Sequence, residues 1–289
     1  MKEVSKEILK EIFKERPKGT YFRKYDFGLL LVIGGGEFYS GSPALSAMAA
    51  LKTGCDMTQI ISPKRAADII ASFSPDLAAY PLEGKWLEEK HLPTLLSMTE
   101  SAKAVSRGNT AVVIGGGAGR SEETKETILK YLSEIDVPAV IDASAIHALG
   151  ENPEIIKGKP FLITPHTYEF FVLTKREIYE LSHEEKQKAV KEEAERLQTT
   201  ILLKEKPDII SDGKEIVLNK AGSPYLSVGG TGDVLAGVCG ALIARGINPF
   251  LAAQAGVFIV CKAGEMAAER LKEGLLATDV IEAIPQVLH

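Results

Sequence analysis

Six short runs of apolar and β-branched residues recur along the chain, and most are followed by a segment with helical periodicity or composition. The runs are almost continuously apolar rather than alternating, which indicates strands buried on both faces. Strands of this kind, linked by helices, form a parallel sheet that is covered on both sides. The expected strands cover 29–33, 57–61, 111–114, 139–141, 161–163 and 200–204, and the expected helices 43–53, 64–72, 86–105, 122–135 and 183–197.

The pattern changes after residue 205. The segments 208–211 and 215–219 flank Asp212 and Gly213, a pair typical of a tight hairpin turn, so we expect an antiparallel edge on the sheet. No internal repeat or flexible linker interrupts the chain, which favours one three-layer α/β/α domain with a mostly parallel central sheet. Further helices are expected at 231–245, 249–271 and 278–284, and an amphipathic helix at 1–17.

Composition excludes several classes of protein. Lys and Arg total 34 against 39 Asp and Glu, a net charge of −5 that provides no global basic field for nucleic acid or anionic lipid. The apolar stretch 249–261 is about 13 residues, shorter than the ~20 of a membrane span, so we expect a buried helix there. Cys55, Cys239 and Cys261 are widely spaced, which favours reduced thiols in a cytoplasmic protein over zinc or disulfides.

Glycine is concentrated in three turns. Two of the clusters directly follow predicted strands, at the sheet edge where parallel α/β proteins bind ligands. Tight strand-to-helix turns are the alternative explanation. No phosphate-binding P-loop motif is present, and Arg120 stands where a dinucleotide fingerprint needs its third glycine. The clusters are Gly34, Gly35, Gly36 and Gly41; Gly115, Gly116, Gly117 and Gly119; and Gly222, Gly229, Gly230, Gly232 and Gly237.

The third cluster has the most specific chemistry. Gly230, Thr231 and Gly232 open a long apolar helix, an arrangement that binds anions through backbone N–H groups and the helix dipole. Asp233 follows within the same turn, where a carboxylate can act as general base on a hydroxyl group that meets a phosphoryl donor. A first-turn carboxylate that only stabilises the helix is the alternative.

This turn, GGTGD followed by VLAG, resembles the anion-hole and catalytic-aspartate motif of the ribokinase-like superfamily. The segments VIGGGEFYSGSPALSAMAALKTG, AVVIGGGAGR, VIDASAIHAL, ITPHTYEF and ILLKEKPDIIS occur in the order found in ADP- or ATP-dependent NAD(P)H-hydrate dehydratases. The resemblance covers the chain from about residue 18 onward. It implies a ribokinase-like fold over 1–289, without an epimerase domain, and repair of hydrated NAD(P)H at the expense of a nucleotide phosphate.

The resemblance also implies roles for individual residues. Asp233 would deprotonate or orient the ring hydroxyl, and the amides of Gly230, Thr231 and Gly232 would hold the transferred phosphate. The hydrate would be bound by Ser42, Gly117, His166 and Asp233, and Glu169 would act near a magnesium ion on the nucleotide. From the residues alone, there is an alternative for Ser42 and His166: each could form hydrogen bonds at the N-terminus of a helix.

The segment after the expected strand 200–204 would meet the nucleotide phosphates. This chain departs from the family pattern there, at Glu205, and also at Gly116 and at Ser144, which replaces the second acid after Asp142. Asp142 itself could instead cap the short helix that follows it. The expected nucleotide-binding residues are Lys204, Glu205, Lys206, Pro207 and Asp208, together with Gly230, Thr231 and Gly232.

These features predict a cytoplasmic lyase that takes an NAD(P)H hydrate and an adenine nucleotide, with Mg²⁺, and assembles into a homo-oligomer. Neither a nucleic acid nor a membrane is expected as partner. A kinase of a small hydroxylated metabolite, such as a thiamine precursor alcohol, is an alternative because such kinases share GGTGD-like loops. A nucleotide-sensing module without turnover is a second alternative.

Overall fold

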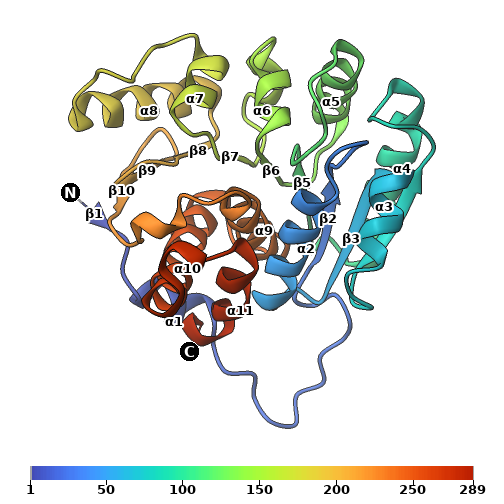
Figure 1. Cartoon of the computed structure of the whole chain (residues 1–289), viewed down its shortest axis with the longest axis horizontal. Coiled ribbons are helices and arrows are strands. Elements are labelled where there is room, and N and C mark those ends of the chain that lie inside the picture. The colour runs from blue at the N-terminus through green and yellow to red at the C-terminus, as the bar shows by residue number, and fades with distance from the viewer. Residues whose placement is uncertain (1, 289) are drawn as a thin grey trace.

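Ten strands form one mixed sheet in the computed structural model, which describes residues 2–288 (Figure 1). The order across the sheet is β4-β3-β2-β5-β6-β7-β8-β9-β10-β1. The strands from β4 to β8 are parallel, and β9 is antiparallel to both of its neighbours. The strands are β1 (Lys2–Glu3), β2 (Leu29–Ile33), β3 (Met57–Pro63), β4 (Ala78–Leu82), β5 (Thr110–Ile114), β6 (Ala139–Ile141), β7 (Phe161–Ile163), β8 (Thr200–Leu203), β9 (Asp208–Ser211) and β10 (Ile216–Asn219).

Helices cover both faces of this sheet, which gives the three-layer ribokinase-like fold expected from the sequence (Figure 1). Because side chains alternate along a strand, Leu30 and Val32 of β2 enter one core while Leu29 and Leu31 enter the other. The first core is covered by α1 (Glu7–Ile12), α2 (Gly41–Lys52), α3 (Lys64–Ala71), α9 (Thr231–Ala244), α10 (Pro249–Leu271) and α11 (Ala277–Val287). The second is covered by α4 (Leu92–Val105), α5 (Glu122–Glu134), α6 (Ser144–Leu149), α7 (Thr167–Thr174) and α8 (His183–Leu197).

The N-terminal segment differs from the sequence prediction. A helix over 1–17 is wrong: α1 spans only Glu7–Ile12, and residues 2–3 form β1. Lys2 pairs with Val217 of β10, so this short strand satisfies the backbone groups of an edge that the predicted hairpin would have left open. The hairpin is therefore present but is not the outermost element.

The start of the helix predicted at 86–105 also needs correction. The helix α4 begins at Leu92, and a single 3₁₀ turn over Glu89–His91 precedes it. The backbone N–H of Glu88 donates to Nδ1 of His91 at 3.0 Å, which holds an extended approach to the turn. Strand β4 was missed altogether because it is an exposed edge strand that contains Pro81.

The apolar helix α10 spans 23 residues, as predicted for 249–271, and so extends beyond the apolar stretch 249–261. Within residues 2–288 it is the one helix that is long and apolar enough, by length and composition alone, to cross a membrane, and 61% of that apolar window is buried in the fold. Gly256 packs against Cys239 of α9, and Gly264 packs against Leu226. Packing against α9 therefore accounts for the apolar composition.

The close contact between α2 and α9 places the first turn of α9. A Cβ atom on Gly237 would lie 2.1 Å from the carbonyl oxygen of Ser46, so only glycine allows this approach. One turn earlier, the Ser46 hydroxyl donates to the backbone carbonyl of Asp233 at 2.9 Å. The glycine at 237 thus fixes where Asp233 begins its helix.

We expect Gly237→Ala to destabilise the protein by about 2 kcal/mol, because the added methyl group must push two helix backbones apart. Gly274→Ala is the matched control, since nothing lies within 4 Å of a Cβ at that position. Urea unfolding monitored by circular dichroism measures both. Equal midpoints for the two variants would contradict the proposed packing.

Candidate active site

The three glycine clusters meet at the carboxyl ends of the central strands. The N–H of Gly35, after β2, donates to the carbonyl of Gly116, after β5, at 2.8 Å. A Cβ on Gly116 would lie 2.7 Å from Oδ1 of Asp233 and 3.1 Å from Cβ of Ser42. The backbone of these turns therefore comes close to the carboxylate because side chains are missing there.

The turn before α9 presents backbone N–H groups to this crevice. Gly230 is the N-cap residue and has a φ of 95°, a conformation that favours glycine. The Thr231 hydroxyl donates to the carbonyls of Leu226 and Val228 and so closes the loop. The first N–H groups of a 14-residue helix lack partners within that helix, which makes this end a site for an anion.

Asp233 lies in the first turn of α9 and faces the glycine turns. Burial raises the pKa of its carboxyl group to about 7, and the negative charge of Asp142 adds to the rise. A hydrogen bond from Ser42 and the charge of Lys204 oppose the shift. A pKa near neutrality is suited to a general base, which a carboxylate that merely favours the helix dipole would not need.

Ser42 does not cap its helix, contrary to the alternative considered from the sequence. The N-cap of α2 is Ser40, and Ser42 is the second residue of the helix. Its side chain is directed instead to Asp233. The capping alternative for Asp142 is also wrong, because Ala143 is the N-cap of α6.

Lys204 connects the buried carboxylates of the crevice. Its ammonium group donates to Oδ1 of Asp142 at 2.8 Å and lies 3.7 Å from Oε2 of Glu169. Burial opposes the charge of Lys204, but Asp142 and Glu169 outweigh that effect and raise the pKa of the ammonium group. Thr164 donates a further hydrogen bond to Asp142 at 2.8 Å. The cation therefore stays charged inside the site.

His166 and Glu169 form a capping box at the start of α7. Nδ1 of the His166 ring accepts from the backbone N–H groups of Tyr168 and Glu169. In return, the backbone N–H of His166 donates to Oε2 of Glu169 at 3.0 Å. The helix-start role weighed for His166 is thus present. Its Nε2 lies 3.5 Å from Oε1 of Glu169, and half of the His166 side chain is exposed toward solvent.

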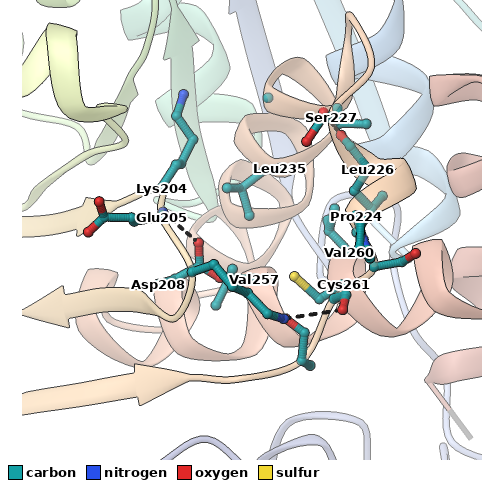
Figure 2. A pocket seen from close by; sticks show the side chains of 16 residues that line it. Lys204, Glu205, Asp208, Pro224, Leu226, Ser227, Leu235, Val257, Val260 and Cys261 are labelled. Atoms are coloured by element: carbon teal, nitrogen blue, oxygen red, sulfur yellow. Dashed lines mark hydrogen bonds between the residues drawn. The ribbon is translucent and has the colours of Figure 1, made fainter. Parts of the chain in front are cut away.

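A cavity of about 500 Å³ lies beside this turn, which is within the range of small-molecule sites (Figure 2). Thr231, Gly232 and Lys204 line one part of it, and an apolar wall lines another, where Asp208 also lies. Figure 2 shows the ammonium of Lys204 pointing away from the apolar wall, where Val257 and Cys261 lie. The apolar wall comprises Ala221, Pro224, Leu226, Leu235, Val257, Val260 and Cys261.

The sequence analysis did not predict the apolar wall, and it predicted only some of the other residues that line the cavity. Six of the eight residues expected to bind nucleotide line the cavity, and Pro207 and Gly230 do not; the six are Lys204, Glu205, Lys206, Asp208, Thr231 and Gly232. Lys206 donates to the carbonyls of residues 220–222, so it holds the loop that forms the wall. The only sequence signal for this wall is Gly222, whose φ is 119°.

Several of these side chains have structural partners. Glu205 pairs with Lys186, and its N–H donates to Asp208 at 3.1 Å. Burial raises the pKa of Asp208 to about 6, while a hydrogen bond from Asn219 lowers it. Pro207 follows a cis peptide bond. The other predicted residue, Gly117, has a φ of 68° and approaches Tyr39.

The fold and the anion-binding turn define a ribokinase-like protein, and solved structures agree. A ribokinase-like superfamily protein from Enterococcus faecalis matches with a TM-score of 0.83 at 25% identity, over 100% of this chain and 95% of that one. The ADP/ATP-dependent NAD(P)H-hydrate dehydratase from Bacillus subtilis, co-crystallised with ATP/Mg²⁺, matches with a TM-score of 0.77 at 21% identity, over 98% and 96%.

The sequence comparison identifies the family. The NAD(P)H-hydrate dehydratase family matches residues 30–286, and the chain belongs to this family. It is 37% identical to the bifunctional NAD(P)H-hydrate repair enzyme of Methanothermobacter thermautotrophicus, over 92% of this chain but 50% of that protein. It is 35% identical to the ADP-dependent (S)-NAD(P)H-hydrate dehydratase of Cenarchaeum symbiosum, over 92% and 90%. The chain thus spans about half the length of its bifunctional relatives.

We expect Lys204→Met to cost about 2 to 3 kcal/mol of stability, because Asp142 and Glu169 lose the cation that offsets their burial. At pH 7, well below the usual lysine pKa of 10.5, the contribution of the charged ammonium is present in full. Lys188→Met, at a side chain that is 75% exposed, is the control. Urea denaturation at pH 7 measures the difference, and equal stability of the two variants would contradict the ion-pair assignment.

Proposed function

We propose that the protein catalyses the nucleotide-dependent dehydration of (6S)-NAD(P)H hydrate to NAD(P)H. One observation carries this proposal. Asp233, whose carboxyl group has a pKa of about 7, lies in a turn of backbone N–H groups beside a nucleotide-sized cavity. The family membership of the chain supports the choice of substrate. ADP is the proposed co-substrate, because the relatives of similar length are named ADP-dependent.

The proposed first step is phosphoryl transfer to the ring hydroxyl. Asp233 takes the hydroxyl proton, and the oxygen attacks the terminal phosphorus of the nucleotide, whose bond to the bridging oxygen breaks. The N–H groups of Gly230, Thr231 and Gly232 and the ammonium of Lys204 stabilise the charge that develops on the phosphate. Preorganised donors of this kind supply most of the catalysis in phosphoryl transfer.

The proposed second step is loss of phosphate. The C6–O bond breaks, inorganic phosphate leaves with both bonding electrons, and the departing phosphate takes a proton from the adjacent ring carbon, which restores the double bond. Ser42, Gly117 and His166 are proposed to hold the hydrate, since Ser42 already contacts Asp233 and Gly117 belongs to the adjoining turn. Only Asp233 is given a proton-transfer role.

A magnesium ion that accompanies the nucleotide fits the carboxylates at this edge. Among residues 2–288, no group of three or more His, Cys, Asp or Glu side chains forms a ready metal cage. Asp142 and Glu169 nevertheless lie next to the phosphate turn, and Mg²⁺ commonly uses one or two carboxylates with phosphate and water. When bound, the ion would neutralise phosphate charge, and Glu169 is its proposed neighbour.

The proposal includes the cavity as the site of the nucleoside. Its apolar wall suits the adenine ring, and the part at Gly232 and Lys204 suits the phosphates.

We also propose that residues 1–289 form a single domain, that the protein is cytoplasmic, and that it forms a homo-oligomer.

The function is tested by incubating the protein with NADH hydrate, Mg²⁺ and ADP or ATP. We expect recovery of absorbance at the wavelength of dihydronicotinamide, with inorganic phosphate formed in equal amount. Thiazole and pyrimidine alcohols serve as competing substrates, because a kinase would yield a stable phosphorylated product from them. No recovery with either nucleotide would refute the dehydratase proposal, and nucleotide binding without any turnover would favour a sensor.

The rate should depend on pH through Asp233. A general base must be deprotonated, so kcat should rise with pH through about 7 and level off above it. Asp233→Asn should lower kcat by about 10²- to 10⁴-fold and abolish this rise. A flat pH profile in the wild type would contradict the assignment.

The same variant has a predictable stability, which serves as its folding control. The raised pKa means that the folded state binds a proton at Asp233 more tightly than the unfolded state does, so this group lowers the stability of the wild type increasingly as pH rises from 3.8 to about 7, and by a constant amount above that. Asp233→Asn should therefore be at least as stable as the wild type at pH 8. Thermal unfolding at pH 5 and pH 8 measures this, and a variant that unfolds at pH 8 would leave its loss of activity attributable to misfolding.

A further inference from the structure

Three aromatic side chains, Phe38, Tyr39 and Trp86, lie beside the glycine turns after β2 and β5, and the proposed mechanism does not use them. Phe38 is 78% exposed and Tyr39 is 61% exposed, although both are large rings that usually lie inside a protein. The ring of Phe38 lies 5.8 Å from the ring of Trp86 at an interplanar angle of 58°. We call these three residues the aromatic rim.

The turn that carries the rim is held by its backbone. The N–H of Gly36 donates to the carbonyl of Tyr39 at 3.0 Å, which closes a tight turn around residues 37 and 38. Arg65 donates to the carbonyl of Glu37 at 2.8 Å. The exposed rings are therefore presented on an ordered loop.

The glycine turns connect the aromatic rim to the catalytic carboxylate. A Cβ on Gly36 would lie 2.5 Å from the Trp86 ring, and one on Gly119 would lie 2.8 Å from it. A Cβ on Gly117 would lie 2.8 Å from Cβ of Tyr39. The next residue back, Gly116, contacts Asp233 in the same way. A row of glycines thus leads from Asp233 to the aromatic rim, and the side chains of Trp86 and Tyr39 pack against it.

The two substrates of the proposed reaction need separate places. The lining of the nucleotide cavity comes from the segment after β8, the loop between β10 and α9, the start of α9, and α10, and none of it comes from the glycine turns after β2 and β5 or from the aromatic rim. A dinucleotide whose nicotinamide ring reacts at Asp233 must place its other half elsewhere. The glycine turns after β2 and β5 lie on another side of Asp233 and meet aromatic rings, which bind bases by stacking.

We infer that the aromatic rim binds the adenine base of the NAD(P)H hydrate, the base at the far end from the reacting ring. This inference rests on the proposed function and deepens it, because it makes the enzyme selective for dinucleotides over nicotinamide mononucleotide. The rim supplies binding and positioning, and it takes no part in proton or phosphoryl transfer.

Trp86 is the single tryptophan of the chain, so its fluorescence reports directly on the rim. NADH absorbs where indole emits, and binding beside Trp86 should quench its emission. We expect Phe38→Ala and Tyr39→Ala each to weaken NADH binding about tenfold, as for loss of a base-stacking ring. The KM for NADH hydrate should rise by the same factor while kcat is retained, and Phe38→Tyr should restore both values.

Reduced nicotinamide mononucleotide, which lacks the adenine half, discriminates between explanations. Its binding and the turnover of its hydrate should be the same in the wild type and the variants. The control is Phe73→Ala, which removes a ring that is 52% exposed beyond the end of α3. It should leave binding of both compounds unchanged.

Equal losses for the mononucleotide and the dinucleotide would overturn the inference, since the rim would then serve the nicotinamide half. Unchanged NADH affinity in both alanine variants would also overturn it, as would a loss of self-association in sedimentation with NADH binding intact. Failure of the proposed function can be told apart from failure of this inference. If the wild type shows no turnover but binds NADH more tightly than Phe38→Ala does, the dehydratase activity is refuted and the base subsite is retained.

Discussion

The site depends on one buried cation. Lys204 lies at the end of β8, where its ammonium group balances Asp142 and Glu169 and lowers the cost of ionising Asp233. Without that cation, the carboxylates at the same sheet edge would repel one another. With it, Asp233 keeps a pKa of about 7, and the other acids hold their positions. A base, a phosphate donor and possible metal ligands can then share one crevice.

The groups that would hold an anion in this site come from the backbone rather than from side chains. The protein has a net charge of −5, yet the turn before α9 offers N–H groups and the positive end of a helix dipole to an anion. Glycine makes this possible at Gly230, where the backbone is left-handed, and at Gly237, where two helices nearly touch. The concentration of glycine in these turns thus has a local electrostatic and steric effect.

The sequence predicted the sheet and the glycine-rich turn that opens α9 because both have strong local signals. Buried parallel strands are continuous apolar runs, and an acid inside a glycine-rich helix start is unusual. The wall formed by Val257, Val260 and Cys261 was missed because an apolar residue that faces a ligand looks the same as one that faces the core. The pairing of β1 with β10 was missed because it joins residues 2–3 to 217–218, and no local pattern encodes such a contact.

The central claim is that the oxygen of the ring hydroxyl becomes bonded to phosphorus before it leaves. Turnover of NADH hydrate that carries ¹⁸O in the hydroxyl group, followed by mass spectrometry of the inorganic phosphate, tests this directly. We expect one ¹⁸O atom in each phosphate released. Recovery of the label in water, with unlabelled phosphate, would show that nucleotide cleavage and dehydration are separate events and would contradict the account.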